Sequence, residues 1–195
     1  MILKEELKTK KGLVFGWVFD DVLSYNQCQS LIDTSSLILK KSSTLGPQID
    51  NYRTSSNCFL KFEENKNANH VANLISHFLD VPVENFEAMQ VVHYSSGQRY
   101  KEHRDSFNPE DIEEQFKRGG QRTWTAFAYL NNVQKGGETF FPLINQSISP
   151  KIGRMVFWKN SVDGEVVQDS LHEAMPPINC EKWGANVWVR ENKFI

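Results

Sequence analysis

After Pro82 the sequence is a succession of short β-prone stretches separated by turn residues. Their β-branched and aromatic composition is typical of strands. The stretches are Glu87–Tyr94, Thr123–Leu130, Glu138–Phe141, Arg154–Trp158, Glu173–Met175 and Ala185–Arg190. Glycine, proline and asparagine clusters between them predict turns. So many short strands without a long intervening helix predict two sheets packed as a double-sheet roll.

Two helices are predicted upstream of these strands. Ser24 and Gln27 form a capping-box pattern, and apolar residues follow at helical spacing to about Ser35. From Glu63 to Leu79, apolar residues recur every three or four positions, which predicts an amphipathic helix. We therefore expect a mainly β (α+β) fold whose N-terminal helices pack on one outer face of a sheet. Two further strands are predicted at Gly12–Asp21 and Arg53–Leu60, and a short surface helix within Pro109–Gly120.

Bulk properties predict one soluble domain. The 195 residues, 39% of them hydrophobic, suffice for a single domain over 1–195 with a sizeable core. A net charge of −2 gives no long-range attraction to nucleic acid or to an anionic membrane, so neither partner is expected. Three cysteines without a Cys-x-x-Cys pair predict reduced thiols. The charged amino terminus has no signal-peptide core, and no apolar run reaches membrane-span length, so a cytoplasmic location is expected.

His103 and Asp105 are candidate metal ligands. In an extended segment alternate side chains share a face, so these two converge while Arg104 points away. A neutral imidazole and a carboxylate suit a divalent first-row metal, and a third ligand would complete one face of an octahedron, leaving the opposite positions open for reactants. Taken alone, the pattern also fits a solvated strand face, because charged side chains usually lie at the surface.

The third ligand must come from elsewhere in the chain. His172 is the best candidate, because it precedes a strand-like stretch and a double-sheet roll brings distant strands side by side. His93 is the rival, although it shares no local turn with His103. His70 and His77 fall in the second predicted helix without a carboxylate or cysteine at ligand spacing, so we expect both to be exposed.

These residues belong to a longer pattern. Its parts are Tyr94-x-x-Gly97-Gln98-x-Tyr100-x-x-His103-x-Asp105, Arg122-x-x-Thr125, Gly136-Gly137-Glu138-Thr139-x-Phe141-Pro142, His172 and Lys182-Trp183. In this order they resemble the catalytic domain of the prolyl 4-hydroxylases, which are iron(II)- and 2-oxoglutarate-dependent dioxygenases on a double-stranded β-helix (a cupin-like jelly roll). The resemblance covers nearly the whole chain. The segment Glu173–Glu181 departs from the family, which more usually has small residues, a Pro-Val pair and a glycine there.

The resemblance implies individual roles. The catalytic iron(II) would be bound by His103, Asp105 and His172. The cosubstrate 2-oxoglutarate would be bound by Lys182, which pairs with its distal carboxylate, and by the hydroxyls of Tyr94 and Thr139. A dianion entering a chain of net negative charge needs such a fixed cation.

The target proline would lie near Glu87, Tyr100, Arg122 and Trp188. The residues alone leave other roles open for these four: Trp188 also fits a core position, and Glu87 with Arg122 also fits an ordinary cross-strand ion pair.

The resemblance implies an enzyme that hydroxylates peptidyl proline while 2-oxoglutarate and dioxygen become succinate and carbon dioxide. Asp105 favours hydroxylation, because related oxygenases that install halide lack this carboxylate. Proline-containing peptides or proteins would be the partners, L-ascorbate an accessory cofactor, and the chain a monomer or weak dimer. Without a signal peptide or a retention signal, the chain looks like the short viral or microbial members.

Two other functions stay open. One is an oxygenase of the same fold that acts on a free amino acid or a nucleobase, although a pI of about 6.2 disfavours nucleic acid. The other is a non-catalytic, cupin-like metal-binding module. The segments Lys41–Tyr52 and Ser106–Gly120 are long and polar enough to be lids that order on substrate binding, or ordinary surface loops.

Overall fold

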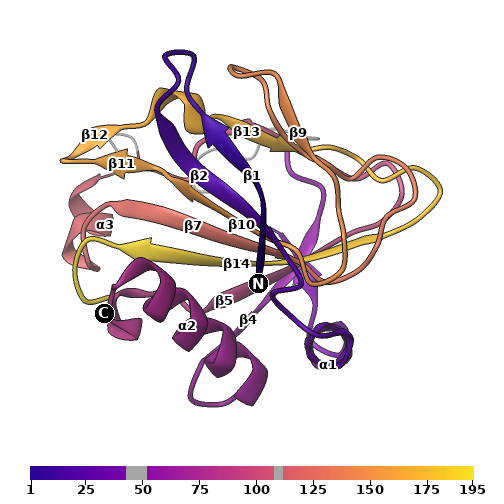
Figure 1. The fold of residues 1–195 in the computed structure, drawn as a ribbon. Coiled ribbons are helices and arrows are strands. Elements are labelled where there is room, and N and C mark those ends of the chain that lie inside the picture. The colour runs from indigo at the N-terminus through magenta and orange to yellow at the C-terminus, as the bar shows by residue number, and fades with distance from the viewer. Residues whose placement is uncertain (43–51, 108–111) are drawn as a thin grey trace.

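The computed structural model describes residues 1–42, 52–107 and 112–195. Strands dominate these ranges, so the predicted mainly β architecture with few helices is confirmed (Figure 1). None of the helices in the described ranges is long and apolar enough to cross a membrane. The middle parts of the two predicted lid segments, 43–51 and 108–111, lie outside the described residues.

The larger sheet has eight strands in the order β1-β2-β10-β7-β14-β5-β4-β3. Their bounds are β1 Ile2–Lys8, β2 Val14–Asp20, β10 Met155–Lys159, β7 Arg122–Tyr129, β14 Lys182–Arg190, β5 Met89–Tyr94, β4 Ser56–Leu60 and β3 Lys40–Lys41. Neighbouring strands are antiparallel throughout. Strands remote in sequence are therefore side by side, as the double-sheet prediction requires.

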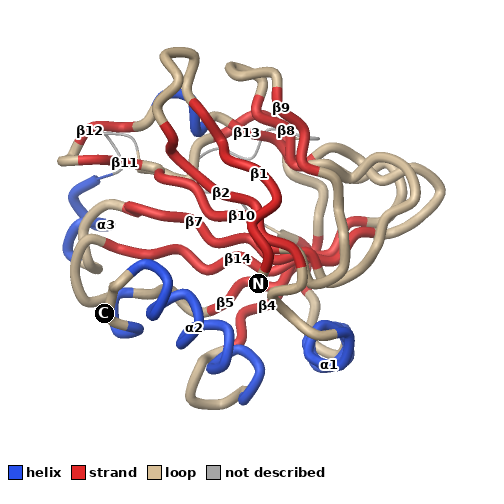
Figure 2. The backbone as a smooth tube through the Cα atoms, in the orientation of Figure 1, coloured by secondary structure: helices blue, strands red, loops and turns tan. Residues whose placement is uncertain are grey.

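The smaller sheet has four strands in the order β6-β13-β8-β9. Their bounds are β6 Tyr100–His103, β13 His172–Ala174, β8 Thr139–Phe141 and β9 Gln146–Ile148. Figure 2 shows this sheet beside the larger one, on the side away from the two long helices. A separate hairpin joins β11 Ser161–Val162 to β12 Glu165–Val166, and the 3-10 turns η1 Val83–Asn85 and η3 Gln168–Ser170 lie in connections.

Side-chain caps define where the two long helices begin. In α1 (Tyr25–Ser36) the capping box is present, because the Gln27 backbone N–H donates to Ser24 Oγ (3.3 Å) and the Ser24 backbone N–H donates to Gln27 Oε1 (2.8 Å). The second helix, α2 (Lys66–Leu79), starts three residues later than predicted, because the Asn65 side chain accepts backbone bonds as its N-cap. A short third helix, α3 (Ile112–Lys117), falls inside the predicted Pro109–Gly120 interval.

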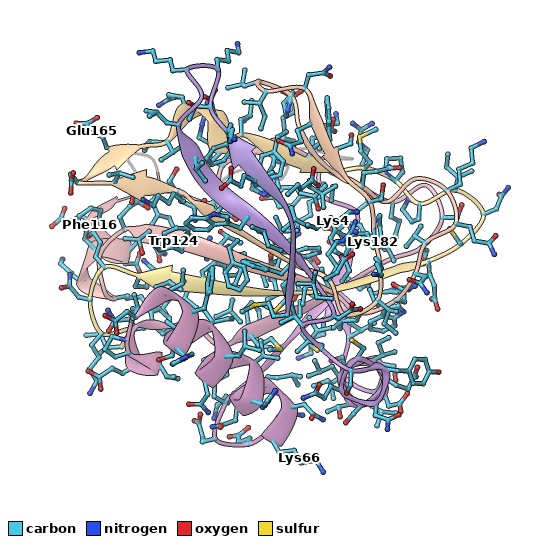
Figure 3. The ribbon with its side chains drawn as sticks, in the orientation of Figure 1. Lys4, Lys66, Phe116, Trp124, Glu165 and Lys182 are labelled. Carbon is cyan, nitrogen blue, oxygen red and sulfur yellow. The ribbon has the colours of Figure 1, made fainter. Side chains whose placement is uncertain are left out.

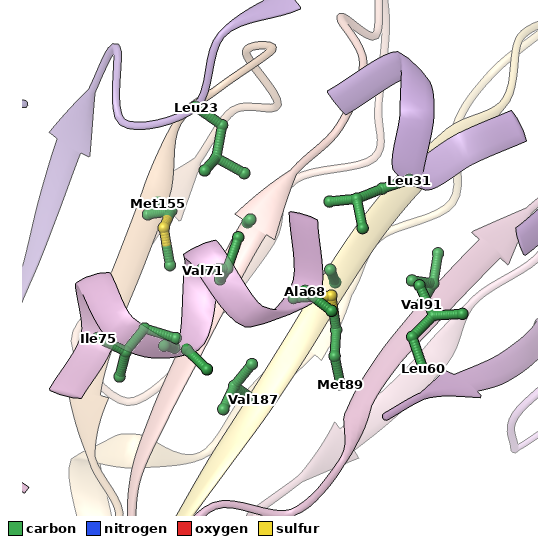
Figure 4. Close-up of a cluster of buried hydrophobic side chains, with 14 of the residues drawn as sticks. Leu23, Leu31, Leu60, Ala68, Val71, Ile75, Met89, Val91, Met155 and Val187 are labelled. Atoms are coloured by element: carbon green, nitrogen blue, oxygen red, sulfur yellow. The ribbon is translucent and has the colours of Figure 1, made fainter. Parts of the chain in front are cut away.

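The larger sheet is apolar on both faces. One face packs against α1 and α2, and residues from both helices and from the sheet form a single core cluster, including Leu31, Val71, Ile75, Met89 and Val187 (Figure 4). The other face packs against the smaller sheet through a second cluster, including Phe127, Tyr129, Trp158, Phe141 and Ile148. The helices therefore lie on one side of the larger sheet, and the smaller sheet lies on the other (Figure 1).

Other sequence predictions are mostly confirmed. The strands expected in Gly12–Asp21 and Arg53–Leu60 appear as β2 and β4, and the three cysteines are free. His70 and His77 are exposed on α2, as expected. The strand β1 was not predicted, because most of its side chains are exposed and it carries little apolar alternation; its hydrogen bonds to β2 define it.

We expect Ile75→Ala to lower the free energy of unfolding by about 2–5 kcal/mol, because the side chain is fully buried between α2 and the larger sheet. Urea denaturation followed by tryptophan fluorescence measures this. The matched control, His70→Ala on the exposed face of the same helix, should change it by less than about 0.5 kcal/mol. Equal losses in both variants would contradict the packing described.

Candidate metal centre

Pairing between β6 and β13 places two histidines face to face. In this antiparallel register His172 is the partner of His103, and a bulge follows it. Each ring is oriented by a backbone carbonyl: Nδ1 of His103 lies 2.7 Å from the Lys101 oxygen, and Nδ1 of His172 lies 2.8 Å from the Ser170 oxygen. Because a carbonyl only accepts, each Nδ1 carries the proton and each Nε2 keeps its lone pair for a metal.

Asp105 completes a triad just beyond the end of β6. Its Oδ1 lies 3.8 Å from Nε2 of His103, and its Oδ2 lies 3.8 Å from Nε2 of His172. One ligand atom from each residue lies within 4.8 Å of the others, so the structure brings the three predicted ligands together. We call His103, Asp105 and His172 the metal triad.

Electrostatics prepares the metal triad for a cation. Burial and the neighbouring His172 lower the pKa of His103 to about 3, so its imidazole is neutral near pH 7. Burial alone would raise the pKa of Asp105, but the two histidines, Arg122 and a hydrogen bond from Thr125 bring that pKa below its usual value. Two imidazoles and one carboxylate with open positions are the donor set of non-haem iron(II) oxygenases.

Aromatic rings hold the two histidines in place. The ring of Tyr100 stacks on His103 with centroids 3.5 Å apart, and Trp158 meets His172 at 4.8 Å. Packed rings and carbonyl bonds together leave each imidazole little freedom to rotate. The donor atoms are therefore preorganised for a metal.

A pocket of about 420 Å³, including its open mouth, contains the metal triad and Lys182. Lys182 begins β14 and is 1% exposed, and Figure 3 shows it inside the protein while Lys66 projects into solvent. Among the described residues its Nζ finds no hydrogen-bond partner, and it lies over the rings of Tyr94, Phe127 and Tyr129 at 5.2–5.4 Å from their centroids. Burial lowers the pKa of Lys182 to about 7, although Glu138 opposes this shift.

An unpaired buried ammonium is costly, so the pocket is suited to an anion. The other two predicted cosubstrate residues are also in the pocket. Tyr94 lies opposite Lys182 in the β5–β14 register, and burial raises the pKa of its hydroxyl, which stays protonated. Thr139 Oγ1 lies 2.7 Å from the Tyr129 hydroxyl oxygen, which also lies 2.9 Å from the Ile148 carbonyl oxygen. A cation and two hydroxyls thus line the pocket beside the metal triad.

The four residues predicted to hold the substrate separate into two pairs. Tyr100 and Trp188 line the pocket. Glu87 and Arg122 lie behind Trp188: Arg122 Nε and Nη2 donate to Glu87 at 2.6 and 2.8 Å, and the Arg122 guanidinium lies 3.8 Å from the Trp188 ring centroid. Arg190 Nε also donates to Glu87, at 2.7 Å. The ion pair left open by the sequence is therefore present, and it supports the Trp188 ring.

The rival ligand His93 lies away from the metal triad. Its Nε2 bonds to Glu181 at 2.9 Å and its ring packs on Trp183. Sequence reasoning gave no role to several pocket-lining residues, namely Arg53, Gln90, Phe127 and Asn186. Arg53 stands in a motif, Arg53-Thr-Ser-Ser, that could have drawn attention to it.

Comparison with known proteins gives consistent matches. The family profile described as the 2OG-Fe(II) oxygenase superfamily matches residues 89–190. A putative prolyl 4-hydroxylase of Acanthamoeba polyphaga mimivirus is 34% identical over 182 residues, covering 91% of this chain and 75% of that protein. Probable prolyl 4-hydroxylase 8 of Arabidopsis thaliana is 31% identical over 203 residues, covering 91% and 69%.

Among solved structures, the viral collagen prolyl hydroxylase vCPH of Paramecium Bursaria Chlorella virus-1, in its 2OG complex, superposes with a TM-score of 0.76. It is 27% identical, and the match covers 90% of this chain and 96% of that one.

We expect His172→Ala to weaken binding of Co(II), a spectroscopic substitute for iron(II), by about 100-fold or more, because one of three protein ligands is lost. Cobalt absorbance titration measures this. His93→Ala is the matched control and should leave cobalt affinity unchanged, since its ring contacts Glu181 and Trp183. The reverse pattern would assign the third ligand to His93.

Proposed function

The chain belongs to the prolyl 4-hydroxylase family of the 2OG-Fe(II) oxygenase superfamily, and on this premise we propose that it hydroxylates proline residues of a peptide or protein. As a family member it is a 2-oxoglutarate-dependent dioxygenase that uses iron(II). The proposed substrate follows from its relatives, which are named prolyl hydroxylases, and from the two aromatic side chains, Tyr100 and Trp188, at the pocket.

The observation that carries this proposal is the unpaired ammonium of Lys182 in the same pocket as the metal triad. A simple metal-binding module has no need of a buried cation near its metal, and burying one without a partner is unfavourable. A dicarboxylate such as 2-oxoglutarate supplies the missing anion. The metal ligands and the cosubstrate anchor therefore support each other.

Iron(II) and 2-oxoglutarate, when bound, supply the oxidising chemistry in which dioxygen and 2-oxoglutarate give succinate, carbon dioxide and a hydroxylated C–H bond. The chain's own residues bind and orient the metal and the cosubstrate, and they exclude water. The metal triad would hold the metal, Lys182 would neutralise the distal carboxylate of 2-oxoglutarate, and Tyr94 and Thr139 would form hydrogen bonds to the cosubstrate. The pocket walls, including Phe127 and Trp158, keep bulk water from the reacting groups.

The proline would lie against Tyr100 and Trp188. Arg122 and Glu87 then act on the substrate through Trp188, whose ring they hold from behind. The indole Nε1 of Trp188 is buried and has no partner among the described residues, so it is a donor available to a peptide carbonyl. A flat ring and a single donor suit a prolyl residue in an extended peptide.

The remaining proposals concern the architecture of the whole chain and its setting. We infer that the two sheets are the halves of a double-stranded β-helix, with α1 and α2 as its outer cover, and that residues 1–195 act as one dioxygenase domain. The use of L-ascorbate, a monomeric or weakly dimeric state, no binding to nucleic acid, a cytoplasmic location and a viral or microbial origin stay predictions.

A peptide screen tests the proposed substrate. The full chain is incubated with iron(II), 2-oxoglutarate, ascorbate and proline-rich peptides, and mass spectrometry should find a gain of about 16 Da, one oxygen atom, on proline. Matched peptides with alanine for proline are the control. Succinate without any gain on proline would favour the free-amino-acid or nucleobase alternative, and no succinate at all would favour the binding module.

We expect Lys182→Met to weaken 2-oxoglutarate binding by about 100-fold while metal affinity is retained, because the partner of a buried charge is removed. Calorimetry with the manganese(II)-loaded protein under anaerobic conditions measures both. Unchanged affinity for 2-oxoglutarate would exclude Lys182 as its anchor.

The pH dependence follows from the lowered pKa of Lys182, about 7. The dianion binds the charged ammonium, so above that pKa the ligand-free protein must first take up a proton, and the apparent Kd should rise by up to tenfold per pH unit. Below that pKa the ammonium is already charged, so Lys182 adds no further pH dependence to the apparent Kd. In Lys182→Met this slope should be absent, and a variant that kept it would assign the titration to another group.

A further inference from the structure

A buried chain of hydrogen bonds leads to the carboxylate of the metal triad. Asn160 Nδ2 donates to Thr125 Oγ1 at 2.8 Å, and Thr125 Oγ1 donates to Asp105 Oδ2 at 2.6 Å. Thr125 and Asn160 are both 0% exposed, so water does not compete for these bonds. The three residues come from different parts of the chain: the segment after β6, the middle of β7, and the residue after β10.

The direction of these bonds is determined by chemistry. The ionised Asp105 carboxylate can only accept hydrogen bonds, so the Thr125 hydroxyl must donate its one proton to it. That hydroxyl can then only accept, so Asn160 must present its amide NH₂ group, as the structure has it. The amide thereby prevents the hydroxyl from turning its proton elsewhere.

Asn160 has little other use for its side chain. Its Oδ1 is buried and accepts no hydrogen bond within the described part of the chain. Its position is secured by the backbone instead, because the Asn160 N–H donates to the Thr123 oxygen at 2.8 Å. Leaving a buried amide oxygen without a hydrogen-bond partner is unfavourable, and a leucine of similar size would avoid this cost. A structural role alone therefore does not account for an amide at this position.

The carboxylate depends on this one bond for its orientation. Arg122 Nη1 reaches the backbone oxygen of Asp105 at 3.4 Å and so does not restrain its side chain. Of the hydrogen bonds in the described ranges, the one from Thr125 is the bond that reaches the Asp105 carboxylate. We propose that Thr125, oriented by Asn160, is a positioning residue that holds Asp105 in place as a metal ligand. The inference rests on the proposed metal-dependent function.

The test compares cobalt(II) affinity and cobalt absorbance, without cosubstrate or peptide, in the full chain and its variants. Thr125→Val should weaken cobalt binding by about 10–100-fold and change the band positions, because a ligand loses its outer partner. Thr125→Ser, which keeps the hydroxyl, should stay within about threefold of the unaltered protein. Thr123→Val is the matched control: it removes a hydroxyl bonded to the Val189 oxygen in the same strand and should leave cobalt binding unchanged.

A double-mutant cycle isolates the role of Asn160. Asn160→Leu should weaken cobalt binding by about three- to tenfold, since the hydroxyl remains but is no longer oriented. Thr125→Val combined with Asn160→Leu should bind no more weakly than Thr125→Val alone, because Asn160 acts only through Thr125. Thermal unfolding of each variant shows that it is folded.

Equal cobalt affinity in Thr125→Val and the unaltered protein would overturn the proposal, as would additive losses in the double variant. If Thr125→Val does not fold, unchanged cobalt affinity in Asn160→Leu would by itself overturn the proposal. These outcomes are separate from failure of the proposed function, which would appear as an unaltered protein that binds no metal or hydroxylates no proline.

Discussion

The antiparallel pairing of β6 with β13 is the constraint on which the site depends. It sets His172 opposite His103 although 69 positions separate them in the chain, and the short turn after β6 then brings Asp105 to the same point. A shift of one residue in this register would turn His172 to the opposite face of its strand. The aromatic contacts of Tyr100 and Trp158 with the two imidazoles act on a geometry that the strand pairing has already established.

Charge is buried in this protein in two different ways. Around Trp188, Glu87 is bonded to both Arg122 and Arg190, so each ion has its partner within the chain. At the pocket, Lys182 has none among the described residues. The first arrangement fixes a wall of the pocket, whereas the second leaves a favourable interaction for a ligand to complete. The contrast separates the paired charges from the unpaired one more clearly than burial alone does, since these side chains are all largely buried.

The features that could be predicted from the sequence are those that depend on residues close together in the chain. The capping box of Ser24 and the amphipathic α2 depend on neighbours in sequence, and the structure has both. His103 and Asp105 converge as predicted, but β6 ends at His103 and a bend, rather than strand alternation, carries Asp105. The choice of His172 over His93 depends on strand register, which the residues alone left open and the family resemblance resolved. Asn160 gave no sequence signal, because its partner Thr125 is remote in the chain, and β1 was missed because pairing with β2 rather than composition makes it a strand.

The larger sheet separates the helix-side core from the pocket. Side chains such as Ile75 and Val71 contribute to the hydrophobic cluster on one face, whereas Phe127 and Trp158 line the pocket on the other. The hydrophobic cluster that stabilises the fold and the pocket thus lie on opposite faces of the same sheet. The helical layer can therefore be redesigned for heat tolerance or expression, through many volume-conserving exchanges, without displacing the side chains that line the pocket.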